Sequence, residues 1–183
     1  MTDLCMEPEA EQMCEKLIAE ALLLDDNVAE SWSILGSIRI SQIRNDEARQ
    51  ALEKSWSLFE NGLVQNELSP ASIPAIIRLA QSMIELEMAE PVLDLTTQLT
   101  RVDDQIPDMY YLNALAHHQL LQTADNESDL IRHNVAIRDA VDLMSRLDEP
   151  VDPELLEAGQ QLVAGLPEVS IELPDSDDEP IEE

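Results

Sequence analysis

The stretch from Ala29 to Phe59, AESWSILGSIRISQIRNDEARQALEKSWSLF, constrains the fold more than any other part of the chain. Apolar residues recur there at intervals of three and four on both sides of a short polar segment, which indicates two amphipathic helices joined by a tight turn. We expect Asn45 and Asp46 to supply the turn and the cap of the second helix, and Asn61 with Gly62 to end it. The stretch therefore predicts an antiparallel helix hairpin.

The order of side chains in this hairpin resembles that of a tetratricopeptide repeat. Trp32, Leu35 and Gly36 follow the W-x2-L-G order that opens such a repeat, and Ala48 and Leu52 occupy the A-x3-F places of its second helix. The usual reason for a glycine at this place is the close approach of two helices. Repeats of this kind stack into a right-handed superhelix, so the resemblance implies further hairpins.

The segment before Ala29 has the pattern of half a repeat. A step of 34 residues back from the second helix of the hairpin places Cys14, Ile18 and Ala21 in matching positions. We expect this segment to be the second helix of a preceding repeat whose first helix is missing from the chain. Two explanations stay open: a shortened product, or an exposed face that another chain covers.

Two further hairpins and a short last helix are expected after Asn61. The second hairpin has Ser72 as the cap of its first helix and Pro91 at the start of its paired helix, and the third has Tyr110 at the tryptophan place. Ser128 is expected to cap the last long helix, and Asp152 with Pro153 to begin a short capping helix that ends at Gly165.

The predicted fold class is all-α: a tetratricopeptide-like right-handed superhelix of about three hairpins, with a preceding half-repeat and a capping helix. Only 3% of the residues are aromatic and four are glycine, which argues against a β-sandwich. We expect residues 1–166 to form this domain. Residues 167–183 are expected to be an acidic disordered tail, in which Ser176, before two aspartates and a glutamate, is a candidate phosphorylation site.

The net charge of the chain restricts the classes of partner that it can bind. Against 39 Asp and Glu there are 10 Lys and Arg, and the formal net charge is −29. Such a charge repels nucleic acid and anionic membranes and favours a basic protein partner, although a merely solvated acidic surface is the alternative. Two cysteines indicate a reducing compartment, and neither a leader nor an apolar span is found, so we expect a soluble protein of the cytoplasm and nucleus.

No pattern of catalytic chemistry is present in the sequence. It lacks a phosphate-binding glycine loop, a nucleophile elbow and an H-E-x-x-H helix, so we expect no enzyme activity and no cofactor. His117 and His118 are adjacent and His133 lies on a later helix, which is poor spacing for a metal site. We expect all three histidines at the surface or in a groove.

A peptide-binding groove follows from the tetratricopeptide resemblance, because the first helices of such repeats line the concave side. Carried over by position, the resemblance assigns the groove to Glu30, Ser33, Ser37, Ile40 and Ser41 in the first hairpin, Ile77, Gln81, Ile84 and Glu85 in the second, and Asp108, Tyr111, Leu115, His118 and Gln119 in the third. The lining is acidic, polar and mildly apolar.

Three stretches resemble a narrower family, the fungal assembly chaperones of ribosomal protein L4: MEPEAEQMCEKLIAEALLLDD, RISQIRNDEARQALEKSWSLF and VDDQIPDMYYLNALAHH. The resemblance covers nearly the whole chain and only the later part of that family. It implies an acidic superhelix that wraps a basic internal loop of newly made L4 during large-subunit assembly and accompanies it to the nucleus. The alternative is a tetratricopeptide scaffold with another protein partner.

Overall fold

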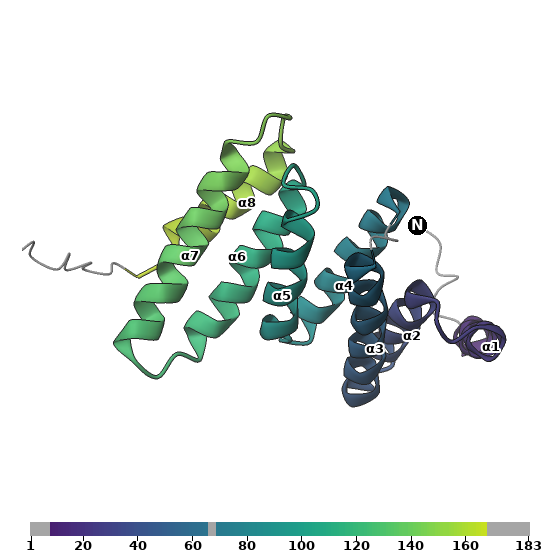
Figure 1. The fold of residues 1–183 in the computed structure, drawn as a ribbon. Helices are drawn as coiled ribbons and strands as arrows, with labels where there is room; N and C mark the ends of the chain where they lie inside the picture. The colour runs from purple at the N-terminus through teal and green to yellow at the C-terminus, as the bar shows by residue number, and fades with distance from the viewer. Residues whose placement is uncertain (1–7, 66–68, 168–183) are drawn as a thin grey trace, which may run out of the picture.

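The structure, a computed structural model, describes residues 8–65 and 69–167. In these two ranges the chain forms eight α-helices and one short 3-10 turn, and no strand. Figure 1 shows α1 to α7 as a row in chain order, from α1 at the right to α7 at the left, with α8 packed beside α7 and α6. The helices are α1 (Pro8–Leu24), α2 (Ala29–Ser41), α3 (Asn45–Val64), α4 (Ile73–Glu85), α5 (Ala89–Thr100), α6 (Pro107–Gln122), α7 (Glu127–Ser145) and α8 (Pro153–Ala164), with the turn at Pro70–Ser72.

The helices repeat as hairpins, as the sequence predicts. The helices α4 and α5 begin 44 residues after α2 and α3, and α6 begins 34 residues after α4. The predicted all-α class is confirmed, and α1 and α8 stand at the places of the half-repeat and the capping helix. Eight of the ten extra residues lengthen α3, which has 20 residues against 12 in α5, and the other two lie in the connection to α4. The insertion is therefore mainly a longer helix and not a longer loop.

Gly36 brings α2 and α3 together. A Cβ atom built at Gly36 would lie 2.4 Å from Cδ2 and 2.8 Å from Cγ of Leu52, which is fully buried. The glycine therefore leaves room for the leucine of the paired helix, and the predicted close approach is confirmed.

Trp32 and Tyr110 occupy the same place in the first and third hairpins and make the same hydrogen bond. The indole Nε1 of Trp32 donates to the carbonyl oxygen of Asp26 at 2.8 Å, and the hydroxyl of Tyr110 donates to that of Asp104 at 2.9 Å. In both cases the acceptor lies six residues earlier, in the loop that enters the hairpin. Tyrosine thus replaces tryptophan here without losing the link between helix and loop.

The interior has two apolar clusters. The larger runs through α2 to α6 and includes Leu52, Leu79 and Leu95, and the smaller joins α6 and α7 to α8. In the smaller cluster, Met144 of α7 packs so closely on Gly159 of α8 that a Cβ there would lie 2.9 Å from the methionine Cε. The capping helix is therefore part of a packed core.

The helix α1 has apolar side chains on two sides. Ile18 is buried, and the guanidinium of Arg39 on α2 binds the carboxylate of Glu15, a hydrogen bond that lowers the pKa of this carboxyl. Met13 and Leu17 are more than half exposed on the same helix. One side of α1 thus packs on α2, and the other presents apolar surface to solvent.

Of three predicted helix signals in the first half of the chain, two are wrong and the third is right in position only. Asn45 and Asp46 lie inside the first turn of α3, and the residue before them makes no capping hydrogen bond through its side chain. The helix α3 continues through Asn61 and Gly62 to Val64. Gly62 does not adopt the positive φ angle with which a glycine commonly ends a helix. Ser72 precedes α4 as predicted, but its side chain makes no capping hydrogen bond.

The tight turns of the first two hairpins are made by residues that the sequence does not mark as turn formers. Ile43 and Glu87 adopt left-handed backbone angles, with φ of 60° and 58°, and they lie 44 residues apart at the same place of the repeat. For an L-residue other than glycine this conformation costs about 1–2 kcal/mol. The stacking of the hairpins holds the turns in this shape.

In the last third of the chain, one predicted cap is wrong and one is confirmed. Asn126 rather than Ser128 caps α7, since its Oδ1 accepts from the amide of Asp129 at 2.8 Å. Asp152 caps α8 as expected, and its Oδ1 accepts from the amide of Glu154 at 2.8 Å. Both caps satisfy backbone donors that a helix start leaves unpaired.

Two histidines meet between α6 and α7. The Nδ1 atoms of His117 and His133 are 2.9 Å apart, so one ring donates a proton and the other accepts it. His133 is only 5% exposed, which makes its predicted place at the surface or in a groove wrong. Burial, followed by the neighbouring His133 and Arg132, lowers the pKa of His117 to about 4, and burial also lowers the pKa of His133.

We expect Gly36→Ala to destabilise the protein by about 1–3 kcal/mol, because the new methyl group displaces buried Leu52. The matched control is Gly62→Ala, where no atom lies within 4 Å of the added Cβ. This control should raise stability by about 0.5–1 kcal/mol through helix propensity alone. Urea unfolding followed by circular dichroism measures both, and equal effects of the two substitutions would contradict the close packing at Gly36.

The histidine pair predicts a pH dependence of stability. A lowered pKa means that the unfolded chain binds the proton more tightly, so stability is full above pH 6.5 and falls as the pH drops toward 4. Between pH 7 and pH 5, His117→Gln should lose less free energy of unfolding than the unmodified protein. His118→Gln, which leaves the pair intact, is the control, and identical slopes for all three proteins would contradict this account.

Candidate protein-binding groove

The candidate groove lies on the first helices of the three hairpins, α2, α4 and α6. Their partners α1, α3, α5 and α7 pack against the other sides, so we call the remaining side of α2, α4 and α6 the inner face. All the residues predicted for the groove lie on these three helices. Ser37, Ser41, Gln81 and Glu85 are exposed, and Glu30, Ile40, Ile77, Ile84, Asp108, Tyr111, Leu115, His118 and Gln119 are partly buried.

The apolar members of the predicted groove are attached to the core beneath it. Ile77, Ile84 and Leu115 pack against the larger apolar cluster, as does Ile40, while Tyr111 packs against the smaller one. These residues therefore offer part of their surface to a ligand from a rigid base. A site on rigid elements loses less conformational entropy when it binds.

Ser33 is the predicted groove residue that the structure buries. It is 8% exposed, and its carbonyl oxygen accepts a hydrogen bond from the hydroxyl of Ser37 at 3.2 Å. Ser37 is one turn further along α2 and remains exposed. The surface available on this helix thus lies around Ser37 and not around Ser33.

A hydrogen bond joins α4 to α6 within the predicted site. The amide Nε2 of Gln119 donates to the carbonyl oxygen of Ile84 at 2.7 Å. This bond satisfies one carbonyl in the last turn of α4 and brings the second and third hairpins together. The Oε1 atom of Gln119 is buried and has no hydrogen-bond partner in the described part of the chain, which costs about 1–3 kcal/mol.

The structure adds two residues that sequence reasoning missed. Ile34 is 54% exposed on α2, and Arg78 is exposed on α4 in line with Gln81 and Glu85. Residues 78, 81 and 85 are spaced by three and four, so they share one side of the helix. This spacing is the signal by which Arg78 could have been found from the sequence.

The inner face is acidic with one basic interruption. Glu30, Glu85 and Asp108 supply carboxylates, whereas Arg39 is held by the carboxylate of Glu15 on α1. Arg78 makes no ion pair with a residue that the structure describes. The inner face therefore carries one carboxylate on each of α2, α4 and α6, and one positive side chain, Arg78, in the middle of α4.

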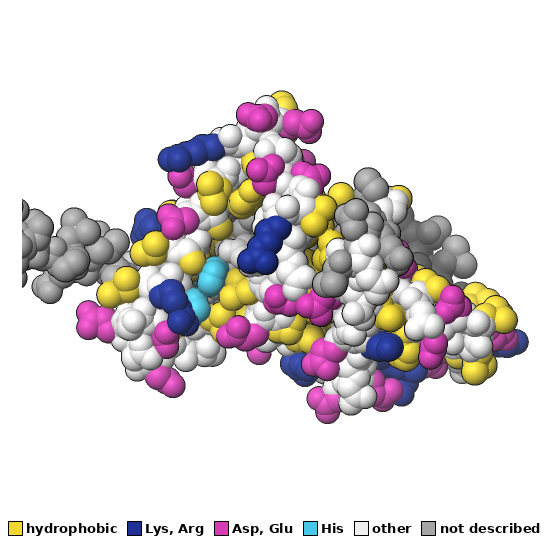
Figure 2. Space-filling model, viewed as in Figure 1, with side chains coloured by type: hydrophobic (Ala, Val, Ile, Leu, Met, Phe, Trp, Pro, Cys, Tyr) yellow, Lys and Arg dark blue, Asp and Glu magenta, His cyan; other side chains and the backbone are white. Residues whose placement is uncertain are grey.

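The rest of the surface is rich in carboxylates, as expected from the excess of Asp and Glu in the sequence. Figure 2 shows carboxylates spread over the face that it presents, with apolar patches between the helices. Among residues 8–65 and 69–167, no group of three or more metal-ligating side chains comes together. None of the helices in these ranges is long and apolar enough to cross a bilayer.

Comparisons with known proteins identify relatives of this chain. No family model matches the chain. It is 36% identical over 132 residues to a Schizosaccharomyces pombe protein named probable assembly chaperone of rpl4, covering 70% of this chain and 39% of that protein. It is 34% identical over 123 residues to an Emericella nidulans protein of the same name, covering 67% of this chain and 32% of that protein.

A solved structure shows the same relationship in three dimensions. The assembly chaperone of RpL4 (Acl4), residues 1–338, matches with a TM-score of 0.56 and 35% identity, over 67% of this chain and 43% of that one. The chain thus spans less than half the length of each of these relatives. Over about two thirds of its own length, this chain is homologous to the fungal assembly chaperones of rpl4.

Proposed function

We propose that this chain is a non-catalytic chaperone that binds a basic segment of newly made ribosomal protein L4 during large-subunit assembly. The observation that carries the proposal is the homology to proteins named assembly chaperones of rpl4. The net charge of −29 supports it, because ribosomal proteins carry basic segments that bind RNA. An acidic chaperone competes with RNA for such a segment.

The inner face supplies the contacts for this role. Glu30 and Asp108 lie in the first turns of α2 and α6, and Glu85 is the last residue of α4, so each of the three first helices carries a carboxylate near one of its ends. Carboxylates bind lysine and arginine through charge-assisted hydrogen bonds. Ile84 and Tyr111 are partly buried beside these carboxylates and offer apolar surface to the methylene stems of the same side chains.

The proposal extends to the internal loop of L4 as the bound segment and to the cytoplasm and nucleus as the places of action. A newly made ribosomal protein is synthesised in the cytoplasm and assembled in the nucleus, so its chaperone must be present where the basic segment is still unprotected. A general scaffold with another protein partner is the competing role, and the identity of the retained protein separates the two.

We expect charge reversal on the inner face to weaken binding of the L4 loop. Glu85→Lys and Asp108→Lys should each lower affinity about five- to tenfold at low salt and by less at high salt, because screening removes the repulsion. Glu53→Lys on α3 has the same change of charge away from the inner face and is the control. Fluorescence anisotropy of a labelled loop over a salt series measures these affinities.

The client itself is tested by co-expression and pull-down in moderate salt. L4 should be retained by this chain, and L4 lacking its internal loop should not. Retention that is indifferent to loop deletion would place the contact elsewhere on L4, and no retention of L4 would leave the scaffold role. If the loop binds but all three charge variants bind equally, the inner face is not the binding surface.

A further inference from the structure

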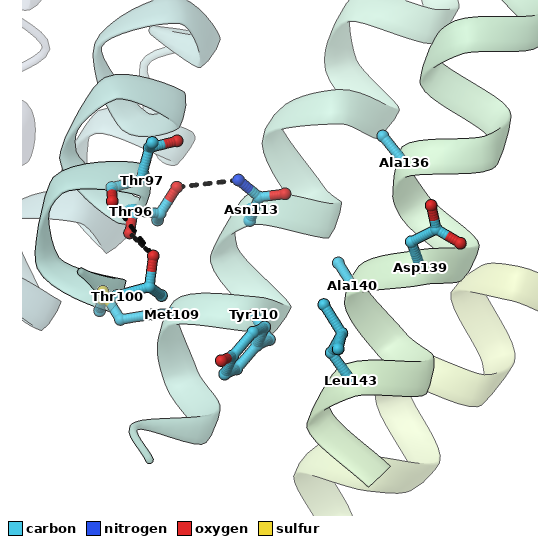
Figure 3. A pocket seen from close by; sticks show the side chains of 10 residues that line it. All are labelled: Thr96, Thr97, Thr100, Met109, Tyr110, Asn113, Ala136, Asp139, Ala140 and Leu143. Carbon is cyan, nitrogen blue, oxygen red and sulfur yellow. Dashed lines mark hydrogen bonds between the residues drawn. The ribbon is translucent and has the colours of Figure 1, made fainter. Parts of the chain in front are cut away.

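A cavity of about 310 Å³ lies between α5, α6 and α7, outside the predicted groove. Its walls come from three threonines of α5, from Met109, Tyr110 and Asn113 of α6, and from Asp139 and its neighbours on α7 (Figure 3). Positions two residues apart on a helix point about 200° apart. Asn113 stands two residues from both Tyr111 and Leu115, so the cavity lies on the side of α6 opposite the inner face.

Two polar side chains, Asn113 and Thr96, line this cavity at positions that are apolar elsewhere in the repeats. The amide Nδ2 of Asn113 donates to the hydroxyl of Thr96 at 2.9 Å. Thr96 and Asn113 stand at the junction between the second and third hairpins, and by repeat spacing the same positions at the preceding junction are Leu52 and Leu79, both fully buried leucines. Thr96 is 1% exposed, so the change to polar side chains occurs at a core position. Two simultaneous polar replacements lose packing energy and create hydrogen-bonding capacity.

Polar atoms of the cavity remain available to a ligand. The carbonyl oxygen of Asn113 is directed away from Thr96 toward α7, as Figure 3 shows. The side chains of Thr97 and Asp139 make no hydrogen bond or ion pair with any residue of the described ranges. The ring of Tyr110 is fixed at the wall by the bond from its hydroxyl to Asp104. The cavity thus combines acceptors with an anchored aromatic ring.

The charge around the cavity is negative. Asp139 lines it, and none of its ten lining residues is lysine or arginine. Asp103 and Asp104 lie close enough to Tyr110 for their charges to raise the pKa of its hydroxyl, after the larger effect of burial. Arg101, the residue after the lining Thr100, adds one positive charge to the same segment. Three carboxylates against one guanidinium leave the surroundings negative, which favours a cation over an anion.

We propose that this cavity binds an arginine side chain of a partner protein. A guanidinium offers five donors in one plane, which suits three kinds of acceptor at this cavity: the exposed carboxylate of Asp139, the carbonyl of Asn113 and the hydroxyl of Thr97. Its flat face stacks on an aromatic ring such as that of Tyr110. Lysine has three donors on a single nitrogen and no flat face, so it uses fewer of these groups.

This site goes beyond the proposed function, because it lies on the other side of α6 from the inner face. A segment bound along the inner face leaves the cavity open. The cavity therefore allows a second contact, with the arginine of a further protein that does not occupy the inner face.

The probe is the peptide acetyl-Gly-Arg-Gly-amide, added to the full 183-residue chain at millimolar concentration. We expect amide chemical shifts to change at Thr96, Thr97, Asn113 and Asp139, with saturation. The same peptide with citrulline, which is neutral and similar in shape, should bind at least about fivefold more weakly, and the lysine peptide should bind with intermediate strength.

Two substitutions test the assigned groups. Asp139→Asn should weaken the arginine peptide about fivefold, and Asn113→Leu, which restores the leucine of the preceding junction, should abolish the shifts at Thr96 and Thr97. Asp142→Asn, one turn further on α7 and outside the cavity, is the control for net charge. Shifts confined to other surfaces, equal binding of the citrulline peptide, or equal losses in the Asp139 and Asp142 variants would overturn the proposal.

Discussion

The fold depends on the need of each helix hairpin to bury its apolar sides on its neighbours. Within a hairpin, the contact of Leu52 with Gly36 fixes how closely two helices approach. Between hairpins, the bonds from Trp32 and Tyr110 to the preceding loops fix how the first and third hairpins begin. These short-range constraints repeat along the chain, so the position of one hairpin determines the next.

The parts of the structure that the sequence predicts well are those that packing decides. The helical periods, the hairpins and the role of Gly36 follow from where apolar residues recur, and the Asp152 cap follows from the proline after it. The turns were harder to predict, because Ile43 and Glu87 adopt left-handed angles that neither residue favours alone. Stacking energy imposes those angles, and local sequence carries no sign of it.

The exposure of the candidate groove residues could be predicted only in part. A position rule taken from related repeats places these residues on α2, α4 and α6, but the rotation of each helix about its axis decides which of them face solvent. Ser33 is buried and Arg78 is exposed because of that rotation. The cavity between α5, α6 and α7 is harder still to predict from the sequence, since Asn113 and Thr96 are 17 residues apart and become a pair only when α5 packs against α6.

Arg78 gives the inner face a capacity for discrimination that net charge alone lacks. A uniformly basic chain laid across α2, α4 and α6 would meet favourable carboxylates at Glu30, Glu85 and Asp108 and an unfavourable guanidinium between them. A segment that carries a neutral or acidic residue opposite Arg78 avoids this cost. On the proposed function, such an inner face would favour basic segments whose spacing of charges matches its own.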